Sequence, residues 1–138
     1  MQKSLFYKTP SQTTFINITD DVLAIIRKTK TKEGLCHLFV KSTTSALVIL
    51  EDEEGIKKDL LWALEKIAPE KRNYAHDTAW GDRNGFAHLR AELLGPGLTI
   101  PIKTNSLDLG TWQNIFLIDF DNKPRKREVV LTVLKLEA

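Results

Sequence analysis

Short apolar runs recur along most of the chain, and many are rich in β-branched or aromatic residues, as strands are. They predict strands over residues 3–7, 13–18, 35–41, 46–50 and 98–102. Each run is bounded by polar or turn-forming residues. The pattern therefore favours a β-rich fold built from short strands.

Two later runs, 112–120 and 127–136, are predicted to be the longest strands, joined across the turn-forming segment 121–124. In the first run, successive residues point to opposite faces and both sets are apolar, with Ile115 and Leu117 on one face and Phe116 and Ile118 on the other. Both late strands therefore need cover on each face from helices, a second sheet or another subunit.

Three segments show the spacing of amphipathic helices. Asp20 can cap the first, and a basic turn before Gly34 ends it. The second runs from about residue 53 to 67, and a stripe on it is expected to face the core: Ile56, Leu60, Leu64 and Ile67. The third covers about 84–94, after a loop over 68–83. The order of elements predicts one α+β domain over residues 1–138, mainly antiparallel sheet, sandwich- or barrel-like, with about three helices.

Composition narrows the class of protein. Hydrophobic residues make up 42% of the chain and charged residues 28%, as in ordinary folded domains. The balance of 20 Lys and Arg against 18 Asp and Glu predicts no nucleic-acid partner. Cys36 is the single cysteine, which excludes an internal disulfide and fits a reducing compartment. Because no run approaches the roughly 18 apolar residues of a membrane span, we expect a cytoplasmic protein without a membrane partner.

Two histidines are the first candidates for chemistry. On the helix predicted over 84–94, His88 falls outside the apolar face, so it looks out to solvent or into a polar pocket. His76 lies in the preceding loop, with Asp77 and Asp82 nearby in sequence. The loop is long enough to bring both imidazoles together, and two imidazoles with oxygen ligands suit zinc or a similar divalent ion. The alternative is that both are ordinary polar loop and surface residues.

Three other segments can contact a ligand, and each also has a plainer explanation. Thr43-Thr44-Ser45 offers hydroxyl and N–H groups to an anion, although such a turn also forms for local reasons. Gly110-Thr111-Trp112-Gln113 permits close backbone approach at Gly110, although core packing by Trp112 explains the segment better. Arg125-Lys126-Arg127 can hold a phosphate, and a solvated hairpin end explains this cluster about as well.

Three segments of the chain together resemble the YjbQ family: GDRNGFAHLRAELLG at 81–95, LGTWQ at 109–113 and STTSA at 42–46. The resemblance runs in the same order across almost the whole chain. It implies a compact α+β protein that assembles as a homotrimer, with a histidine-rich pocket for a metal ion and an anion. The activity usually attached to the family is a weak, secondary thiamine phosphate synthase activity.

The resemblance also carries over to particular residues. It implies His76 and His88 as metal ligands, Asp82 and Asn84 as loop residues of the site, and 111–113 as a segment beside the pocket.

The sequence departs from the family pattern at one informative place. The strand after Gly34 usually ends in a histidine followed by Thr-Thr or Thr-Ser, whereas this chain has Ser42 at the first position. His37 is an odd number of positions away, so in a regular strand it faces the opposite side and does not replace the lost ligand. With two imidazoles, metal binding should weaken or need Ser42, Asp82 or water as oxygen ligands.

Two functional hypotheses follow. In the first, the protein is enzyme-like and acts on a small phosphorylated substrate, with Asp82 as proton acceptor, His88 as the second catalytic residue, and zinc as the expected metal. The expected ligand contacts are Ser42, Thr43, Thr44, Asn84, Thr111, Trp112, Gln113, Arg125 and Arg127. In the second, the protein is a non-catalytic trimeric binding or assembly protein whose site has degenerated.

Overall fold

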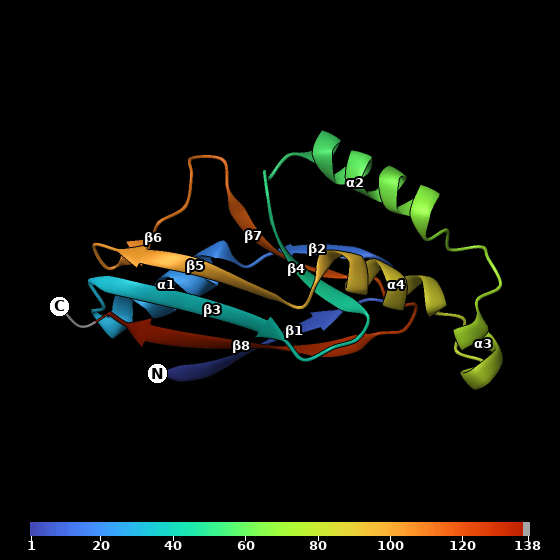
Figure 1. The fold of residues 1–138 in the computed structure, drawn as a ribbon, viewed down its shortest axis with the longest axis horizontal. Helices are drawn as coiled ribbons and strands as arrows, with labels where there is room; N and C mark the ends of the chain where they lie inside the picture. The colour runs from blue at the N-terminus through green and yellow to red at the C-terminus, as the bar shows by residue number, and fades with distance from the viewer. Residues whose placement is uncertain (137–138) are drawn as a thin grey trace.

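The computed structural model describes residues 1–136, which form two antiparallel sheets and four helices (Figure 1). In chain order the elements are β1 (Gln2–Thr9), β2 (Thr14–Asn17), α1 (Thr19–Thr29), β3 (Glu33–Val40), β4 (Ser45–Leu50), α2 (Glu54–Ile67), α3 (Ala75–Trp80), α4 (Gly85–Leu94), β5 (Gly97–Lys103), β6 (Ser106–Leu107), β7 (Asn114–Asp119) and β8 (Arg125–Lys135). The α+β class and the antiparallel character predicted from the sequence are confirmed. None of the helices within residues 1–136 is long and apolar enough to span a membrane.

The first sheet has the strand order β1-β8-β3-β5-β6, and the second has the order β2-β7-β4. All neighbouring strands in both sheets are antiparallel. The predicted hairpin of the two late strands is wrong, because β7 and β8 belong to different sheets. The segment between them crosses from one sheet to the other, and this crossing brings polar residues from both sheets together.

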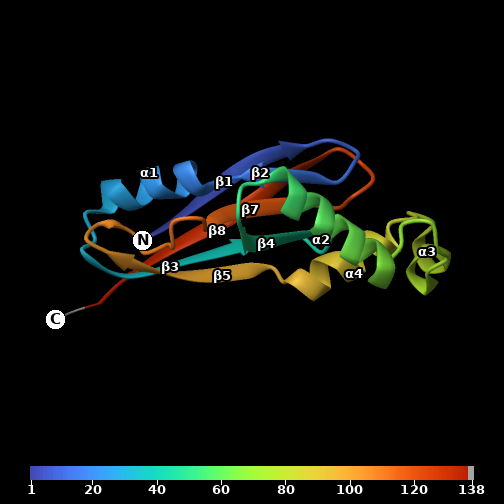
Figure 2. The same cartoon turned by 90° about the horizontal axis from the view of Figure 1, so that it is seen from above.

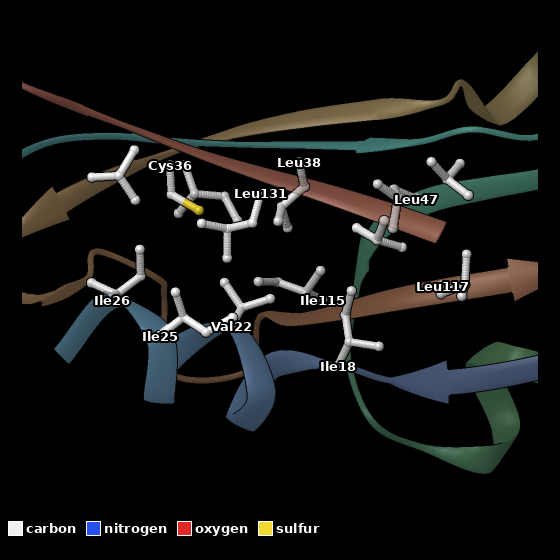
Figure 3. Packing of buried hydrophobic residues seen from close by; sticks show 14 of the residues in the cluster. Ile18, Val22, Ile25, Ile26, Cys36, Leu38, Leu47, Ile115, Leu117 and Leu131 are labelled. Atoms are coloured by element: carbon white, nitrogen blue, oxygen red, sulfur yellow. The ribbon is translucent and has the colours of Figure 1, made fainter. Parts of the chain in front are cut away.

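The larger core fills the space between the five-stranded sheet on one side and α1 with the second sheet on the other. Figure 3 shows Val22, Ile25 and Ile26 of α1 pointing toward Cys36 and Leu38 of β3. Ile115 and Leu117 of β7 join the same cluster.

A second, smaller core lies on the other face of β7. Phe116 and Ile118 pack there with Phe86 and Ala87 of α4 and Leu64 of α2. The predicted two-sided burial of the first late strand is therefore confirmed. Figure 2 shows α1 toward one end of the molecule and the three later helices toward the other. The inter-sheet core and the helix-covered core thus share β7 as their common wall.

The second late strand, β8, differs from the prediction. Val129, Leu131 and Val133 are buried in the larger core, but the opposite face of β8 is not covered and Leu134 is 56% exposed. Neighbouring strands continue this open face with Phe6 and Phe39, which are 56% and 42% exposed. Large apolar side chains therefore remain on the outer face of the five-stranded sheet.

The helices also depart from the prediction in detail. The N-cap of α1 is Ile18, and Asp20 lies inside the first turn rather than capping the helix. On α2 only Leu64 of the predicted core stripe is buried, while Ile56 and Ile67 are exposed. The short helix α3 occupies part of the segment predicted to be a loop. On α4, Phe86 is buried, but Leu89 and Leu93, which share its face at helical spacing, are exposed.

Candidate functional site

The site begins where the apolar core between the sheets ends. Along β7 the inward positions run from Ile115 and Leu117 to Asp119, and Asp121 continues the alternation just beyond the strand. Along β8 the inward positions before Val129 are Arg127 and Arg125. Because both strands keep their alternation past the last apolar layer, two carboxylates of one sheet face two guanidinium groups of the other.

Arg127 is at the centre of this polar layer. Its Nε donates to Asp119 Oδ2 at 2.7 Å, and its Nη2 donates to Asp119 Oδ1 at 2.9 Å. Nη2 also donates to Thr44 Oγ1 at 2.6 Å and lies 3.3 Å from Asp121 Oδ2. Thr9 Oγ1 donates to the same Asp119 carboxylate at 2.5 Å. The two-pronged guanidinium–carboxylate geometry fixes Arg127 firmly.

Asp121 connects the segments around it and is only 2% exposed. Its Oδ2 accepts from Arg125 Nε at 2.9 Å and from Thr44 Oγ1 at 3.1 Å. Its Oδ1 accepts from the Asn122 N–H at 2.8 Å and from Asn84 Nδ2 at 3.3 Å. Burial alone would raise the pKa of Asp121, but the hydrogen bonds outweigh it and hold the pKa below its ordinary value. Asp121 is therefore ionised at neutral pH.

The segment from α3 to α4 forms the other wall. Gly81 ends α3 with a φ of 70°, a left-handed conformation that glycine adopts readily. Asp77 Oδ1 accepts from the Gly85 N–H at 3.0 Å, which ties the start of α4 to α3. Asn122 Nδ2 donates to the carbonyl oxygens of Asp82 and Arg83 at 3.0 and 3.2 Å. These bonds position the loop that carries the predicted site residues.

The two helices bring His76 and His88 together, with ring centroids 4.2 Å apart. Burial lowers the pKa of His88, and the neighbouring His76 lowers it further. The Nε2 of His76 is buried and has no hydrogen-bond partner among the described residues 1–136. The pair therefore offers a neutral imidazole and an unsatisfied ring nitrogen side by side.

These groups line one cleft with a volume of about 650 Å³. Its charged side chains are Lys41, Asp82, Asp121, Arg125 and Arg127. Its other lining residues are Phe39, Val40, Ser42, Thr43, Thr44, His76, Trp80, Asn84 and His88. The cleft thus has three cationic and two acidic side chains, with exposed aromatic residues contributing to its lining.

Relatives of known sequence and structure resemble the chain throughout. A family model described as UPF0047 protein YjbQ-like matches residues 3–136. This chain belongs to the UPF0047 YjbQ-like family. A UPF0047 protein of Archaeoglobus fulgidus is 40% identical over 130 residues, which cover 94% of this chain and 98% of that protein. One from Methanothermobacter thermautotrophicus is 35% identical, covering 91% of this chain and 86% of that protein.

Solved structures agree with this assignment. A YbjQ-like protein of unknown function from Sulfolobus solfataricus superimposes with a TM-score of 0.91 at 31% identity, covering 99% of this chain and 97% of that one. A hypothetical protein from Aeropyrum pernix superimposes with a TM-score of 0.90 at 27% identity, covering 99% of each chain. The fold of the UPF0047 family therefore extends over the whole described chain.

Most of the residues predicted for this UPF0047 site gather at the cleft. The structure brings together Ser42, Thr43, Thr44, His76, Asp82, Asn84, His88, Arg125 and Arg127. The segment 111–113 does not lie beside the cleft of its own chain, because it precedes β7 whereas Asp121 follows the other end of that strand. There Gly110 N–H donates to Gln113 Oε1 at 2.8 Å, and Trp112 is 72% exposed. Trp112 is thus not a core residue either.

The organising role of Asp121 and Asp119 was not predicted from the sequence. Asp121 was expected in a turn between two paired strands. The signal was present in the period-two pattern, because Asp119 and Asp121 share the parity of Ile115 and Leu117.

The cleft does not fit a zinc site with three protein ligands. Within residues 1–136, no group of three or more His, Cys, Asp or Glu residues is arranged to hold a metal ion. The Ser42 hydroxyl is engaged, since it donates to Ser45 Oγ at 3.0 Å and accepts from the Thr44 N–H at 3.1 Å. His37 lies outside the cleft lining and contacts Thr99 Oγ1 at 3.0 Å. Among the described residues the cleft therefore offers two imidazoles and no third protein ligand arranged beside them.

Cys36 is not a candidate nucleophile. It is fully buried in the larger core, and burial raises the pKa of its thiol to about 12.

Proposed function

We propose that the cleft binds a small phosphorylated or otherwise anionic ligand. The observation that carries this proposal is the convergence of Arg125, the two imidazoles and the hydroxyl-bearing segment 42–44 on one cleft. Guanidinium, imidazole and hydroxyl groups are the usual donors to phosphate oxygens.

Arg125 is the most favourable cation for this role. It bonds Asp121 through Nε, and its side chain is 39% exposed, which leaves the end of the guanidinium accessible from the cleft. Arg127, by contrast, is held by Asp119 and Thr44 and is only 11% exposed. We therefore assign direct anion binding to Arg125 and a supporting role to Arg127.

A catalytic role for Asp82 and His88 forms part of the first hypothesis. Asp82 is half-buried in the cleft lining, and its Oδ1 lies 3.6 Å from Lys123 Nζ. Its carboxylate can accept a proton from a bound substrate, and His88, whose pKa is lowered, is neutral and can do the same. The weak thiamine phosphate synthase activity implied by the family resemblance is the first reaction to assay.

The second hypothesis, a binding protein without catalysis, is favoured by the missing third metal ligand. A divalent ion, zinc first, would have only His76 and His88 as imidazole ligands. We infer that anion binding by this chain does not depend on such an ion.

We also propose that the chain assembles as a homotrimer through the outer face of the five-stranded sheet. Phe6, Phe39 and Leu134 leave large apolar surfaces exposed there. A second copy of the chain would remove that surface from water. Phe39 also lines the cleft, so a neighbouring subunit on this face would lie next to the ligand.

Calorimetric titration with inorganic phosphate and a simple phosphate monoester, in the presence of a chelator, tests the ligand proposal. We expect saturable binding that Arg125→Ala weakens by about tenfold or more, since a hydrogen bond to a charged group contributes roughly 1.5–3 kcal/mol. His37→Ala is the control, because His37 lies outside the cleft. Equal affinity in both variants, or no binding by the wild-type protein, would refute the proposal.

A further inference from the structure

Asn84 carries a polar atom whose partner is missing. The residue is 3% exposed and lines the cleft immediately before α4. Its Nδ2 donates to Asp121 Oδ1 at 3.3 Å. Its Oδ1 is buried and accepts no hydrogen bond from any group within residues 1–136. A buried amide oxygen without a donor is unfavourable, so such atoms are normally satisfied by protein, water or ligand.

The orientation of the amide follows from its neighbour. Asp121 accepts hydrogen bonds from Arg125, Thr44 and the Asn122 N–H, so it is an ionised carboxylate that cannot donate. Only the NH₂ group of Asn84 can therefore face Asp121. The amide oxygen is therefore the atom left without a partner, on a residue that lines the cleft, and exchanging the two ends would place oxygen against oxygen.

Asn84 differs in this respect from the cationic and hydroxyl groups of the cleft. Arg125 and Lys41 can only donate. Of the hydroxyl groups in segment 42–44, that of Thr43 can donate to an anion, because Ser42 and Thr44 donate theirs to Ser45 and Asp121. These groups recognise the oxygens of a phosphate. Asn84 Oδ1 needs the opposite partner, a hydrogen-bond donor, which a fully ionised phosphate does not supply.

We propose that Asn84 is a specificity-determining residue whose Oδ1 accepts a hydrogen bond from a hydroxyl or ammonium group of the ligand. This inference rests on the proposed anion-binding function and narrows its substrate class. The ligand is a phosphate ester that also carries a donor, such as a phosphorylated polyol or amino alcohol. A phosphorylated molecule with a purely apolar remainder would leave the amide oxygen unsatisfied and should bind more weakly.

Matched pairs of phosphate esters test this inference without any substitution. At the two-carbon length, 2-hydroxyethyl and 2-aminoethyl phosphate are compared with propyl phosphate, which has the same number of non-hydrogen atoms but ends in a methyl group. At the three-carbon length, 3-hydroxypropyl phosphate is compared with butyl phosphate. We expect a donor-bearing ester of at least one length to bind the wild-type protein about tenfold more tightly than its apolar counterpart.

Asn84→Ala removes the acceptor and should reduce that preference, the ratio of the affinities for the donor-bearing and apolar esters, to about one. Because this variant also loses the bond to Asp121, its folding is checked by circular dichroism, and the wild-type series stands if it fails to fold. Equal affinities within both pairs would overturn the inference and indicate that water satisfies Asn84. If none of the esters binds, the proposed anion-binding function itself has failed.

Discussion

The polar layer between the sheets can be tested through Asp121→Asn. The substitution keeps the shape of the side chain but removes its charge and replaces one acceptor oxygen with a donor group. Asp121 is buried and accepts from Arg125, Arg127, Thr44 and Asn84. An asparagine amide would direct N–H groups toward groups that are themselves donors, so at least one contact becomes repulsive.

The expected loss of stability is about 3 kcal/mol. Removing one partner of a buried ion pair typically costs about 3–5 kcal/mol. The lower end applies because Arg127 keeps its two bonds to Asp119, at 2.7 and 2.9 Å, and Arg125 is partly solvated.

The stabilisation by Asp121 also depends on pH. Since the pKa of Asp121 is below the ordinary 3.8, its stabilisation is present above that pH and is lost as the pH falls through the lower folded-state pKa.

Urea unfolding at neutral pH, followed by tryptophan fluorescence and circular dichroism, measures the change. Asp82→Asn is the matched control, because Asp82 is half-exposed and its ion pair with Lys123 spans 3.6 Å. That variant should change the free energy of unfolding by less than about 1 kcal/mol. If Asp121→Asn lowered the free energy of unfolding no more than its control, the polar layer would not stabilise the fold. Asp121 would then not hold Arg125, Thr44 and Asn84 in position.

Two further predictions concern assembly and pH. Leu134→Glu places a charge on the exposed face of β8 and should convert the proposed trimer to monomers, as measured by light scattering. Trp62→Glu, on the exposed surface of α2, is the control and should leave the trimer intact. A monomeric wild-type protein would contradict the proposed assembly. Burial lowers the pKa of His88 in the folded state below the ordinary 6.5. As the pH falls below 6.5, His88 of the unfolded chain therefore takes up a proton before His88 of the folded chain does. The free energy of unfolding should decline between pH 6.5 and the lower folded-state pKa. His88→Gln should reduce this decline in urea unfolding series, and an unchanged slope would show that His88 does not titrate as described.

Most of the strands could be predicted because their signal is local. The alternation of Ile115 and Leu117 against Phe116 and Ile118 requires no knowledge of the partner strands, and the structure assigns the two sets to different cores. The pairing of β7 and β8 could not be predicted in the same way. A turn-like segment between two apolar strands normally forms a hairpin, and only the packing of two sheets determines that the chain crosses between them here.

Part of the site was predictable because its residues are close in sequence, whereas segment 42–44 and the Arg125–Arg127 cluster were predicted separately, as a hydroxyl-rich turn and a basic cluster. His76, Asp82, Asn84 and His88 lie within one loop and the helix that follows. The role of Asp121 depends instead on contacts with Thr44 and Asn84, which are distant in sequence. No local pattern reports such contacts.

The other predictions that failed concern apolar faces, and they share a physical cause that is relevant to assembly. The apolar faces of α2 and β8 were both expected to be buried, yet Ile56, Ile67 and Leu134 are exposed in a single chain. A hydrophobic pattern reports that a face avoids water, and it does not say whether its own chain or another supplies the cover. For β8 the proposed trimer supplies that cover, and its failure to form would leave the apolar outer face without an explanation. Trp112 is also exposed, and it lies at the opposite end of β7 from the cleft of its own chain. Only a neighbouring subunit could therefore bring segment 111–113 to a cleft.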